Sequence, residues 1–119
     1  MILRYWRGWA SRENAHAYEQ VARERILPSF AARELPGYRG SYLLRRPAGE
    51  EVEYAVIMTF DSLDSVHAFA GDDCDAAYVP APVREVLNRF DERVSHYEVL
   101  LTPPGTARAA TMPRTIGSP

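Results

Sequence analysis

Two side chains in predicted strands at opposite ends of the chain have the chemistry for acid–base work. His96 lies midway along its strand, on the face that carries Val94, Glu98 and Leu100. A neutral imidazole there can move a proton near pH 7, although a bond to a backbone carbonyl or to Glu98 would equally explain it. The guanidinium of Arg7 can stabilise a phenolate or enolate, or it can pair with an acidic residue such as Glu98. The candidate catalytic residues are therefore His96 and Arg7.

Large aromatic side chains are the candidates for the walls of a binding pocket. Aromatic walls suit flat, polycyclic ligands, although such side chains more often belong to the core. The residues that we predict to contact a substrate are Trp6, Trp9, Tyr54, Phe69 and Tyr78. The ligand they favour is a small aromatic molecule.

An acidic loop surrounds the single cysteine. Asp72, Asp73 and Asp75 flank Cys74, but no histidine follows at the spacing of a metal-binding motif, and acidic loops are generally solvated. Cys74 also has no neighbouring base in the sequence that would activate it as a nucleophile. We therefore predict neither a metal site nor a catalytic cysteine here.

Composition limits the kind of protein this is. The chain has 119 residues, enough for one domain. Its formal net charge of −2 gives no reason to expect nucleic acid or an anionic membrane as a partner. No apolar run approaches the roughly 20 residues of a membrane span, and the N-terminus does not resemble a signal peptide. With only one cysteine, these features predict a cytoplasmic protein.

One strand, residues 51–60, organises the rest of the chain. Val52, Tyr54, Val56, Met58 and Phe60 alternate onto one face. The middle of the opposite face is apolar as well, since it carries alanine and isoleucine. A strand with one face in water would alternate between apolar and polar residues, so both faces of this strand should be covered.

The remaining elements follow from periodicity and from capping and turn residues. Pro28 should kink the first helix, which we expect to continue to about residue 32 because Phe30 continues its apolar stripe. Predicted strands lie at 2–9, 38–46, 51–60 and 94–101, and predicted helices at 11–32, 62–70 and 82–90. Residues 1–102 should form the domain, and 103–119 a flexible tail.

This order predicts an α+β, ferredoxin-like split βαβ fold with a four-stranded antiparallel sheet. The helices of such a fold cover one face of the sheet. An apolar second face is most simply buried against the same face of a second copy, related by a two-fold axis. We therefore predict an obligate homodimer.

Four stretches of the chain resemble the antibiotic biosynthesis monooxygenase family. They are Arg4–Trp9 (RYWRGW), Leu35–Gly40 (LPGYRG), Ile57–Gly71 (IMTFDSLDSVHAFAG) and Phe90–Val99 (FDERVSHYEV). The resemblance implies a dimeric α/β barrel. It also implies oxidation of electron-rich polycyclic phenols by molecular oxygen, without a bound metal or flavin. Relatives of this family degrade haem, and others with the same fold cyclise or bind ligands.

The functional residues of the family are only partly matched. The quinone-forming members are associated with an Asn, a Trp and an Arg around the pocket. The haem-degrading members use an Asn on the first strand, a Trp on the second helix and a His that binds iron. Here the first strand has no Asn, the helix at 62–70 has no Trp, and His67 lies off that helix's apolar stripe. The haem-degrading set is therefore incomplete.

These features favour a monooxygenase that works without a cofactor on an aromatic polyketide-like or phenolic substrate. His96 would assist proton removal, Arg7 would hold the anion, and Trp6, Trp9 and Tyr54 would exclude water. One alternative is a cyclase or isomerase that uses the same pocket for acid–base chemistry. Another is a protein that binds a small ligand without catalysis.

Overall fold

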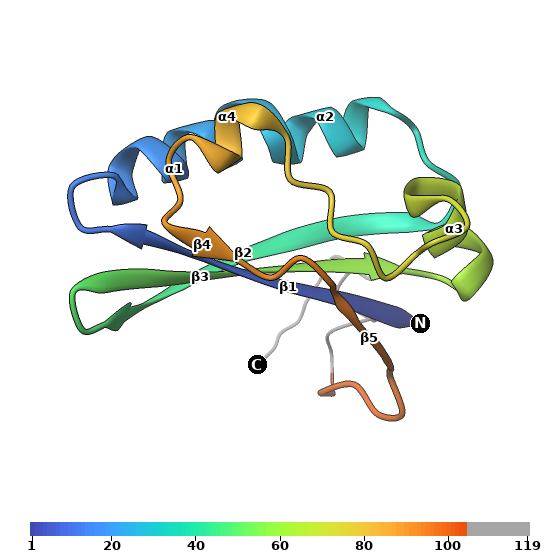
Figure 1. The fold of residues 1–119 in the computed structure, drawn as a ribbon. Coiled ribbons are helices and arrows are strands. Elements are labelled where there is room, and N and C mark those ends of the chain that lie inside the picture. The colour runs from blue at the N-terminus through green and yellow to red at the C-terminus, as the bar shows by residue number, and fades with distance from the viewer. Residues whose placement is uncertain (105–119) are drawn as a thin grey trace, which may run out of the picture.

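A five-stranded antiparallel sheet forms the floor of the molecule (Figure 1). The computed structural model describes residues 1–104, so the expected tail lies outside the described residues except for its first two positions. The order across the sheet is β2-β3-β1-β4, with β5 also paired to β1. The strands are β1 (Ile2–Ser11), β2 (Tyr38–Ala48), β3 (Glu51–Phe60), β4 (Arg89–Phe90) and β5 (Ser95–Glu98).

The two central strands, β1 and β3, pair without interruption from Ile2 opposite Phe60 to Ser11 opposite Glu51. Side chains alternate along a strand, and direct partners share a face. This register therefore determines on which side of the sheet each side chain of β1 and β3 lies. Even-numbered residues of β1 point towards the helices, and odd-numbered residues point to the open face. The predicted bounds of β3 are confirmed, and β1 is two residues longer than predicted.

The edge beside β1 differs from the single strand predicted at 94–101. β4 pairs with one end of β1 and β5 with the other. Between them the chain leaves β1 and bonds to a loop instead: Val94 donates its amide hydrogen to the carbonyl of Asp75, and Ala77 donates to that of Glu92. Loop residues thus take over the backbone partners in the middle of this edge.

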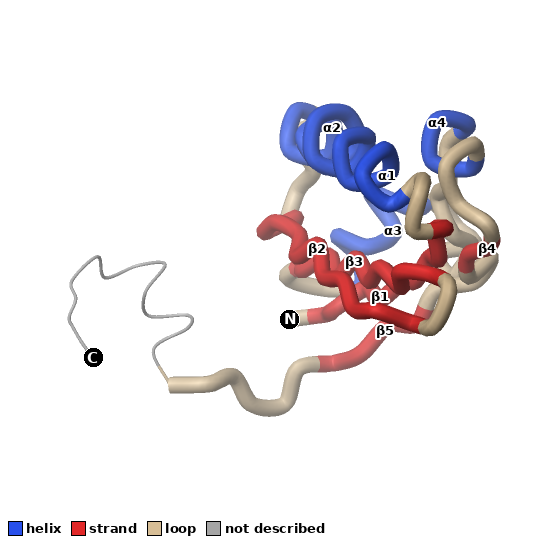
Figure 2. The backbone as a smooth tube through the Cα atoms, turned by 90° about the vertical axis from the view of Figure 1, so that its left-hand side faces the viewer, coloured by secondary structure: helices blue, strands red, loops and turns tan. Residues whose placement is uncertain are grey.

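All helices lie on one side of the sheet (Figures 1 and 2). They are α1 (Ala15–Val21), η1 (Ala22–Ile26), α2 (Leu27–Ala32), α3 (Leu63–Ala70) and α4 (Ala81–Arg84). The first three form one continuous helix across the sheet. None of the helices in residues 1–104 is long and apolar enough to cross a membrane. The α+β ferredoxin-like fold is as predicted.

The long helix continues to Ala32 as predicted, and its irregular segment lies just before Pro28. Proline has no amide hydrogen, so the carbonyl four residues earlier loses its usual partner. The chain responds with a wider π-helical turn, in which Leu27 donates to the carbonyl of Ala22, five residues back. Such turns are frequent at functional sites, and Ala22 and Ile26 both line the cavity described below.

Two predicted helix ends are wrong. Ser11 does not cap the first helix, because it still belongs to β1 and its Oγ accepts from the amide of Asn14 in the following turn. The helix predicted at 82–90 ends at Arg84, since the amide of Asn88 already donates to the carbonyl of Trp9 and begins the pairing of β4. In both places a backbone partner on β1 or in a turn outcompetes the helix.

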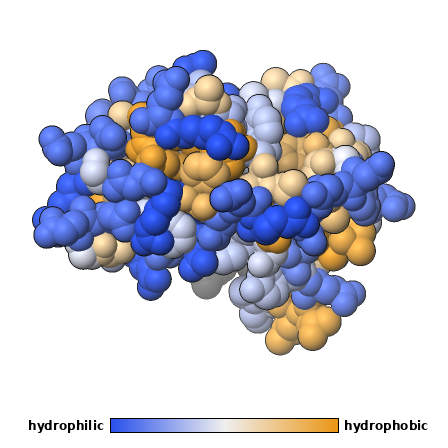
Figure 3. Space-filling model, viewed as in Figure 1, coloured by the Kyte–Doolittle hydropathy of each residue, from blue (hydrophilic) through white to orange (hydrophobic). Residues whose placement is uncertain are grey.

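The face of the sheet away from the helices is rich in exposed apolar side chains. Tyr42, Leu44 and Tyr97 lie on it and are 56%, 46% and 57% exposed. After β5 the chain leaves the sheet, with Leu100 and Leu101 about 90% exposed; this segment projects below the domain in Figures 1 and 2 and ends in a hydrophobic knob in Figure 3. Within residues 1–104, these apolar groups have no cover.

Candidate functional site

A cavity lies between the long helix and the sheet. Its volume is about 50 Å³, room for a few water molecules. Its lining is apolar and aromatic except for the guanidinium of Arg4 and the hydroxyl groups of two tyrosines. The lining includes Arg4, Trp6, Tyr18, Phe30, Phe69 and Tyr78.

Arg4 is the charged residue of this lining. It is only 3% exposed and lies 5.3 Å from the ring centroid of Phe69, measured from its Cζ. Nη1 donates to the carbonyl of Cys74, and Nη2 donates to that of Ala76 at 2.8 Å. Burial lowers the pKa of Arg4, and the charge of Asp75 opposes this effect; a guanidinium nevertheless stays charged at neutral pH.

His96 lies behind Arg4 as seen from the cavity. The two residues are direct partners across β1 and β5, and Arg4 Nη1 lies 2.9 Å from His96 Nε2. A guanidinium has no acceptor, so Nε2 must accept this hydrogen bond and the ring proton must be on Nδ1. Nδ1 then donates to Asp75 Oδ1, 3.1 Å away. Arg4, His96 and Asp75 therefore form a hydrogen-bonded chain from the cavity to the surface.

This chain should make the protein less stable in mild acid. Burial and the neighbouring Arg4 lower the pKa of His96, although Asp75 opposes both effects. The unfolded chain, with a histidine pKa of about 6.5, then binds a proton that the folded chain resists. The free energy of unfolding should thus fall as pH drops below about 6.5, with a slope of up to about 1.4 kcal/mol per pH unit. Urea unfolding of the original chain and of His96→Gln at pH 7.5 and 5.5 would measure this.

The matched control for this experiment is His67→Gln, because His67 is exposed and bonds only to the carbonyl of Gly71. The His96→Gln variant should lose the pH-dependent part of stability, and the control should keep it. Carboxylates whose pKa is lowered, such as Glu19 beside Tyr54 and Arg45, titrate at more acidic pH. An equal pH dependence in His96→Gln would show that this histidine is not the responsible group.

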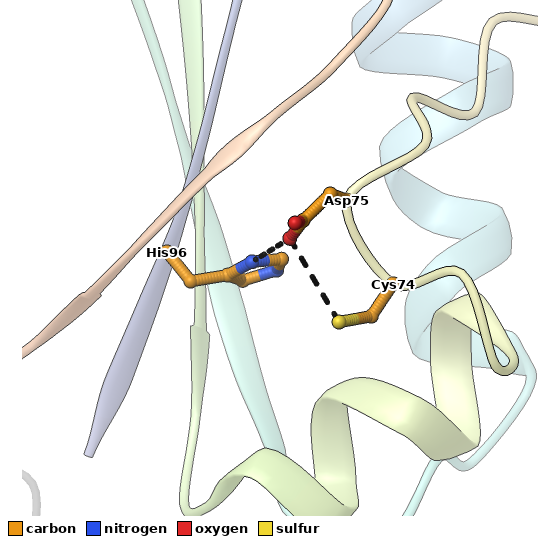
Figure 4. Close-up of side chains that lie close together, drawn as sticks. All are labelled: Cys74, Asp75 and His96. Atoms are coloured by element: carbon orange, nitrogen blue, oxygen red, sulfur yellow. Dashed lines mark hydrogen bonds and ion pairs between the residues drawn. The ribbon is translucent and has the colours of Figure 1, made fainter.

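Figure 4 shows that Cys74, Asp75 and His96 lie together, with one potential ligand atom from each within 4.8 Å of the others. The sequence argument that no histidine lies near this loop therefore fails in three dimensions. The residues nevertheless fit a metal ion poorly. The Nδ1 of His96 carries a proton, its Nε2 is held by Arg4, and the charge of Arg4 repels a cation. Asp73 is paired with Arg93 instead.

Arg7 and Trp9 lie on the open face, opposite the cavity. Arg7 Nε donates to Asp91 Oδ2 at 3.0 Å, and this hydrogen bond raises the pKa of Arg7. Its predicted ion pair therefore forms with Asp91 rather than with Glu98. Trp9 is stacked between Arg7 and Arg89, whose Cζ atoms lie 5.1 and 4.1 Å from its ring. The structure does not bring Arg7 together with His96, and a catalytic role for Arg7 would require a second site on this face.

Three of the five predicted aromatic residues line the cavity. Trp6 is held there by a 2.9 Å hydrogen bond from its Nε1 to the carbonyl of Asp91, and Phe69 and Tyr78 form part of the wall. Tyr54 points towards the helices but belongs to the core: it is 1% exposed, and its hydroxyl donates to Glu19 Oε2 at 2.6 Å. Tyr78 is 56% exposed at the rim, where its movement would enlarge the cavity.

The main omission of the sequence analysis is Arg4. A signal for it was present, since an arginine between Ile2 and Trp6 stands on the apolar, helix-facing side of a two-sided strand. A charge at such a position must be paired or hydrogen-bonded. Its partners could not be foreseen, because the carbonyls of Cys74 and Ala76 come from a loop about seventy residues away.

No family model matches the chain, and no curated protein sequence matches it. Similar solved structures exist. One is the heme-degrader MhuD from Mycobacterium tuberculosis with two hemes bound in its active site, with a TM-score of 0.52 and 21% identity over 85% of this chain and 98% of the other. A second is a MhuD mutant with two manganese protoporphyrin IX molecules per active site, with a TM-score of 0.53 and 23% identity over 87% and 99% of the chains.

This similarity covers nearly the whole of both chains and confirms the class of fold. The protein has the α+β ferredoxin-like fold, which it shares with the MhuD structures. Sequence identity at this level carries the fold and not the site. The chemistry has to be argued from the residues of this chain.

Proposed function

We propose that the protein is an oxygenase that binds a flat aromatic molecule in the cavity between the long helix and the sheet. The observation that carries the proposal is this cavity, walled by aromatic rings and with one buried cation in its lining. Such a site suits an electron-rich aromatic substrate. The superfamily fold, shared with heme-degrading proteins, makes oxygen chemistry the favoured use of it.

The proposed reaction is that of an anthrone-type substrate with molecular oxygen. Loss of a proton from the substrate's CH2 group gives a carbanion conjugated with its oxygen. The carbanion reduces oxygen and forms a C–O bond to a peroxide, which then loses water. One substrate and one O2 thus yield one quinone and one H2O, so the substrate supplies all the electrons. The protein contributes binding, deprotonation and exclusion of water.

His96 is the proposed proton acceptor, and Asp75 would stabilise its charged form. In the unliganded chain Arg4 stands between His96 and the cavity. Proton transfer to His96 therefore requires that the hydrogen bond from Arg4 opens when a substrate is bound.

Purified protein should increase oxygen uptake and quinone absorbance with an anthrone-type substrate above the autoxidation blank. His96→Ala should lower this excess rate by roughly 10²- to 10⁴-fold, the usual contribution of a general acid or base. His67→Ala, which alters an exposed histidine, is the matched control.

The dependence on oxygen decides between the alternatives. Turnover that persists without oxygen would contradict the oxygenase and establish the cyclase or isomerase alternative. Ligand binding with no turnover under either condition would establish a binding protein. An unchanged rate in His96→Ala would remove this residue from the mechanism.

Heme is the second candidate substrate, because the similar structures are of heme-degrading proteins. None of the three histidines of the chain lines the cavity, so no imidazole stands there to bind the heme iron. A Soret band that saturates on titration with heme, and weakens in a Phe69→Ala variant of the cavity wall, would favour this candidate over the aromatic phenol.

We also propose that the open face of the sheet pairs with the same face of a second copy. Tyr42, Leu44 and Tyr97 are exposed together on this face, and a contiguous exposed apolar patch is typical of an interaction surface. The chain after β5 extends away from its own domain with Leu100 and Leu101 uncovered, as expected of an arm that reaches a neighbour. A two-fold axis through the face would bury these groups in both copies.

A further inference from the structure

We infer that the cavity binds its ligand as an anion, with a negatively charged oxygen of an aromatic molecule paired to Arg4. This inference rests on the proposed use of the cavity as a substrate site, and it names the charge of the substrate and the residue that selects it. The expected ligands are aromatic oxyanions: a phenolate, an enolate or an aryl carboxylate.

Arg4 is buried without a counter-ion among residues 1–104. The guanidinium is 3% exposed, yet none of the ion pairs within 4.0 Å among residues 1–104 includes it. Its partners are two carbonyl groups and a neutral imidazole. The nearest acidic group, Asp75, is reached only through His96. A buried charge normally has a paired partner, and an anionic ligand would supply one here.

Arg4 and Tyr18 supply free hydrogen-bond donors at the cavity. A guanidinium has five N–H groups, and three of them are used in the hydrogen bonds above. The Nε hydrogen and one Nη2 hydrogen have no partner among the described residues. Tyr18 also lines the cavity, is 2% exposed, and has a hydroxyl without a hydrogen-bond partner in residues 1–104. Burial raises the pKa of Tyr18, so this hydroxyl remains a donor.

An aromatic surface lies next to the charge of Arg4. Phe69 lies against Arg4 and packs edge-on to Phe30, with 5.1 Å between the ring centroids. Both rings belong to the cavity wall. A ligand that pairs an oxyanion with Arg4 would therefore place its apolar body against aromatic side chains.

The hydrogen-bonded chain behind Arg4 explains how binding and deprotonation would be linked. The guanidinium is oriented by His96, which is in turn oriented by Asp75. If Arg4 turns towards an oxyanion, its hydrogen bond to Nε2 opens and frees that lone pair to accept a proton. The same movement would thus hold the anion and activate the base.

The test uses two aromatic probes that differ in charge and hardly in shape, 2-naphthoate and 2-naphthamide. Neither needs to be oxidised, so binding can be measured by calorimetric titration whether or not the protein is an oxygenase. In the original chain, naphthoate should bind roughly 10- to 100-fold more tightly, the range of a hydrogen bond to a charged group. Arg4→Met should abolish this preference and retain naphthamide binding, and Arg4→Lys should restore part of it.

Arg33→Met is the matched control. The Cζ of Arg33 also lies over the ring of Phe69, at 5.1 Å, but Arg33 is exposed and does not line the cavity. This variant should keep the full preference for naphthoate. If Arg4→Met does not fold, Arg4→Lys decides the matter: its preference for naphthoate should be smaller than that of the original chain and of Arg33→Met.

Equal affinity for the two probes in the original chain, or tighter binding of naphthamide, would overturn the inference and leave the cavity as a site for neutral ligands. A preference that survives in Arg4→Met would overturn the assignment to Arg4. Binding of neither probe would overturn the inference together with the cavity as a binding site. Absence of oxygen turnover alongside a clear preference for naphthoate would contradict only the proposed oxygenase.

Discussion

The double variant Leu44→Glu, Ile57→Glu is expected to sediment as a monomer, whereas the original chain is expected to sediment as the proposed dimer. Both side chains lie on the open face, on adjacent strands. A two-fold axis through this face would bring the four new carboxylates into an apolar interface, where burial of unpaired charge costs several kcal/mol. We expect the dissociation constant of the dimer to rise at least about 100-fold, equivalent to roughly 3 kcal/mol. Analytical ultracentrifugation measures this directly.

The matched control is Leu63→Glu. Leu63 is 52% exposed and begins α3, on the side of the sheet that carries the helices. This control should leave the dimer intact, and circular dichroism should show that all three chains are folded. A mass of 13.4 kDa for the original chain at every concentration would contradict the dimer.

Replacing Phe60 by alanine is expected to lower the free energy of unfolding by roughly 3–5 kcal/mol, the range for removing a buried phenylalanine. Phe60 is 0% exposed. Its ring lies 5.6 Å from that of Tyr38 and 5.9 Å from that of Phe69, centroid to centroid. The variant would therefore leave a cavity between the sheet and α3. Urea unfolding at pH 7.5 gives the value.

Two further variants separate loss of packing from other effects. Phe60→Leu keeps an apolar side chain and should cost distinctly less than Phe60→Ala. Leu63→Ala removes an exposed leucine nearby in the sequence and should change stability by no more than about 0.5 kcal/mol. A loss below about 1 kcal/mol in Phe60→Ala would mean that the neighbouring rings collapse into the space and that this core is loosely packed.

Most of the fold was predictable because it depends on local periodicity. The alternation of apolar residues over 51–60 gave β3 with its observed bounds, and the apolar stripe through Phe30 carried the first helix past Pro28 to Ala32. The largest errors are on the edge beyond Arg84, and a smaller one is at Ser11, which ends β1 and does not cap the first helix. Beyond Arg84, backbone groups pair with β1 or with the loop at Asp75 and Ala77. This pairing depends on the course of the chain and not on a periodic pattern of side chains, so it could not be predicted from the sequence.

The candidate site was predicted only in part. Three of the predicted aromatic residues line the cavity, and His96 lies beside it. These residues could be predicted because the apolar pattern around them and the chemistry of their side chains are visible in the sequence. Arg7 was predicted and Arg4 was missed. The register of β1 against β3 places Arg4 on the side of the cavity and Arg7 on the other. Two arginines three positions apart look alike until the helices are known to cover one face and not the other.

By itself, the sequence determined the order of the elements, the central strand and the two apolar faces of the sheet, because hydrophobic alternation is set residue by residue along the backbone. The tertiary structure alone decided which charges meet. An isolated antiparallel β-bridge between Ala76 and Arg93 holds the loop beside β5. This bridge places Cys74 and Asp75 next to His96 and Arg4. Contacts between segments so far apart depend on register and loop path, and these are fixed only when the whole chain is packed.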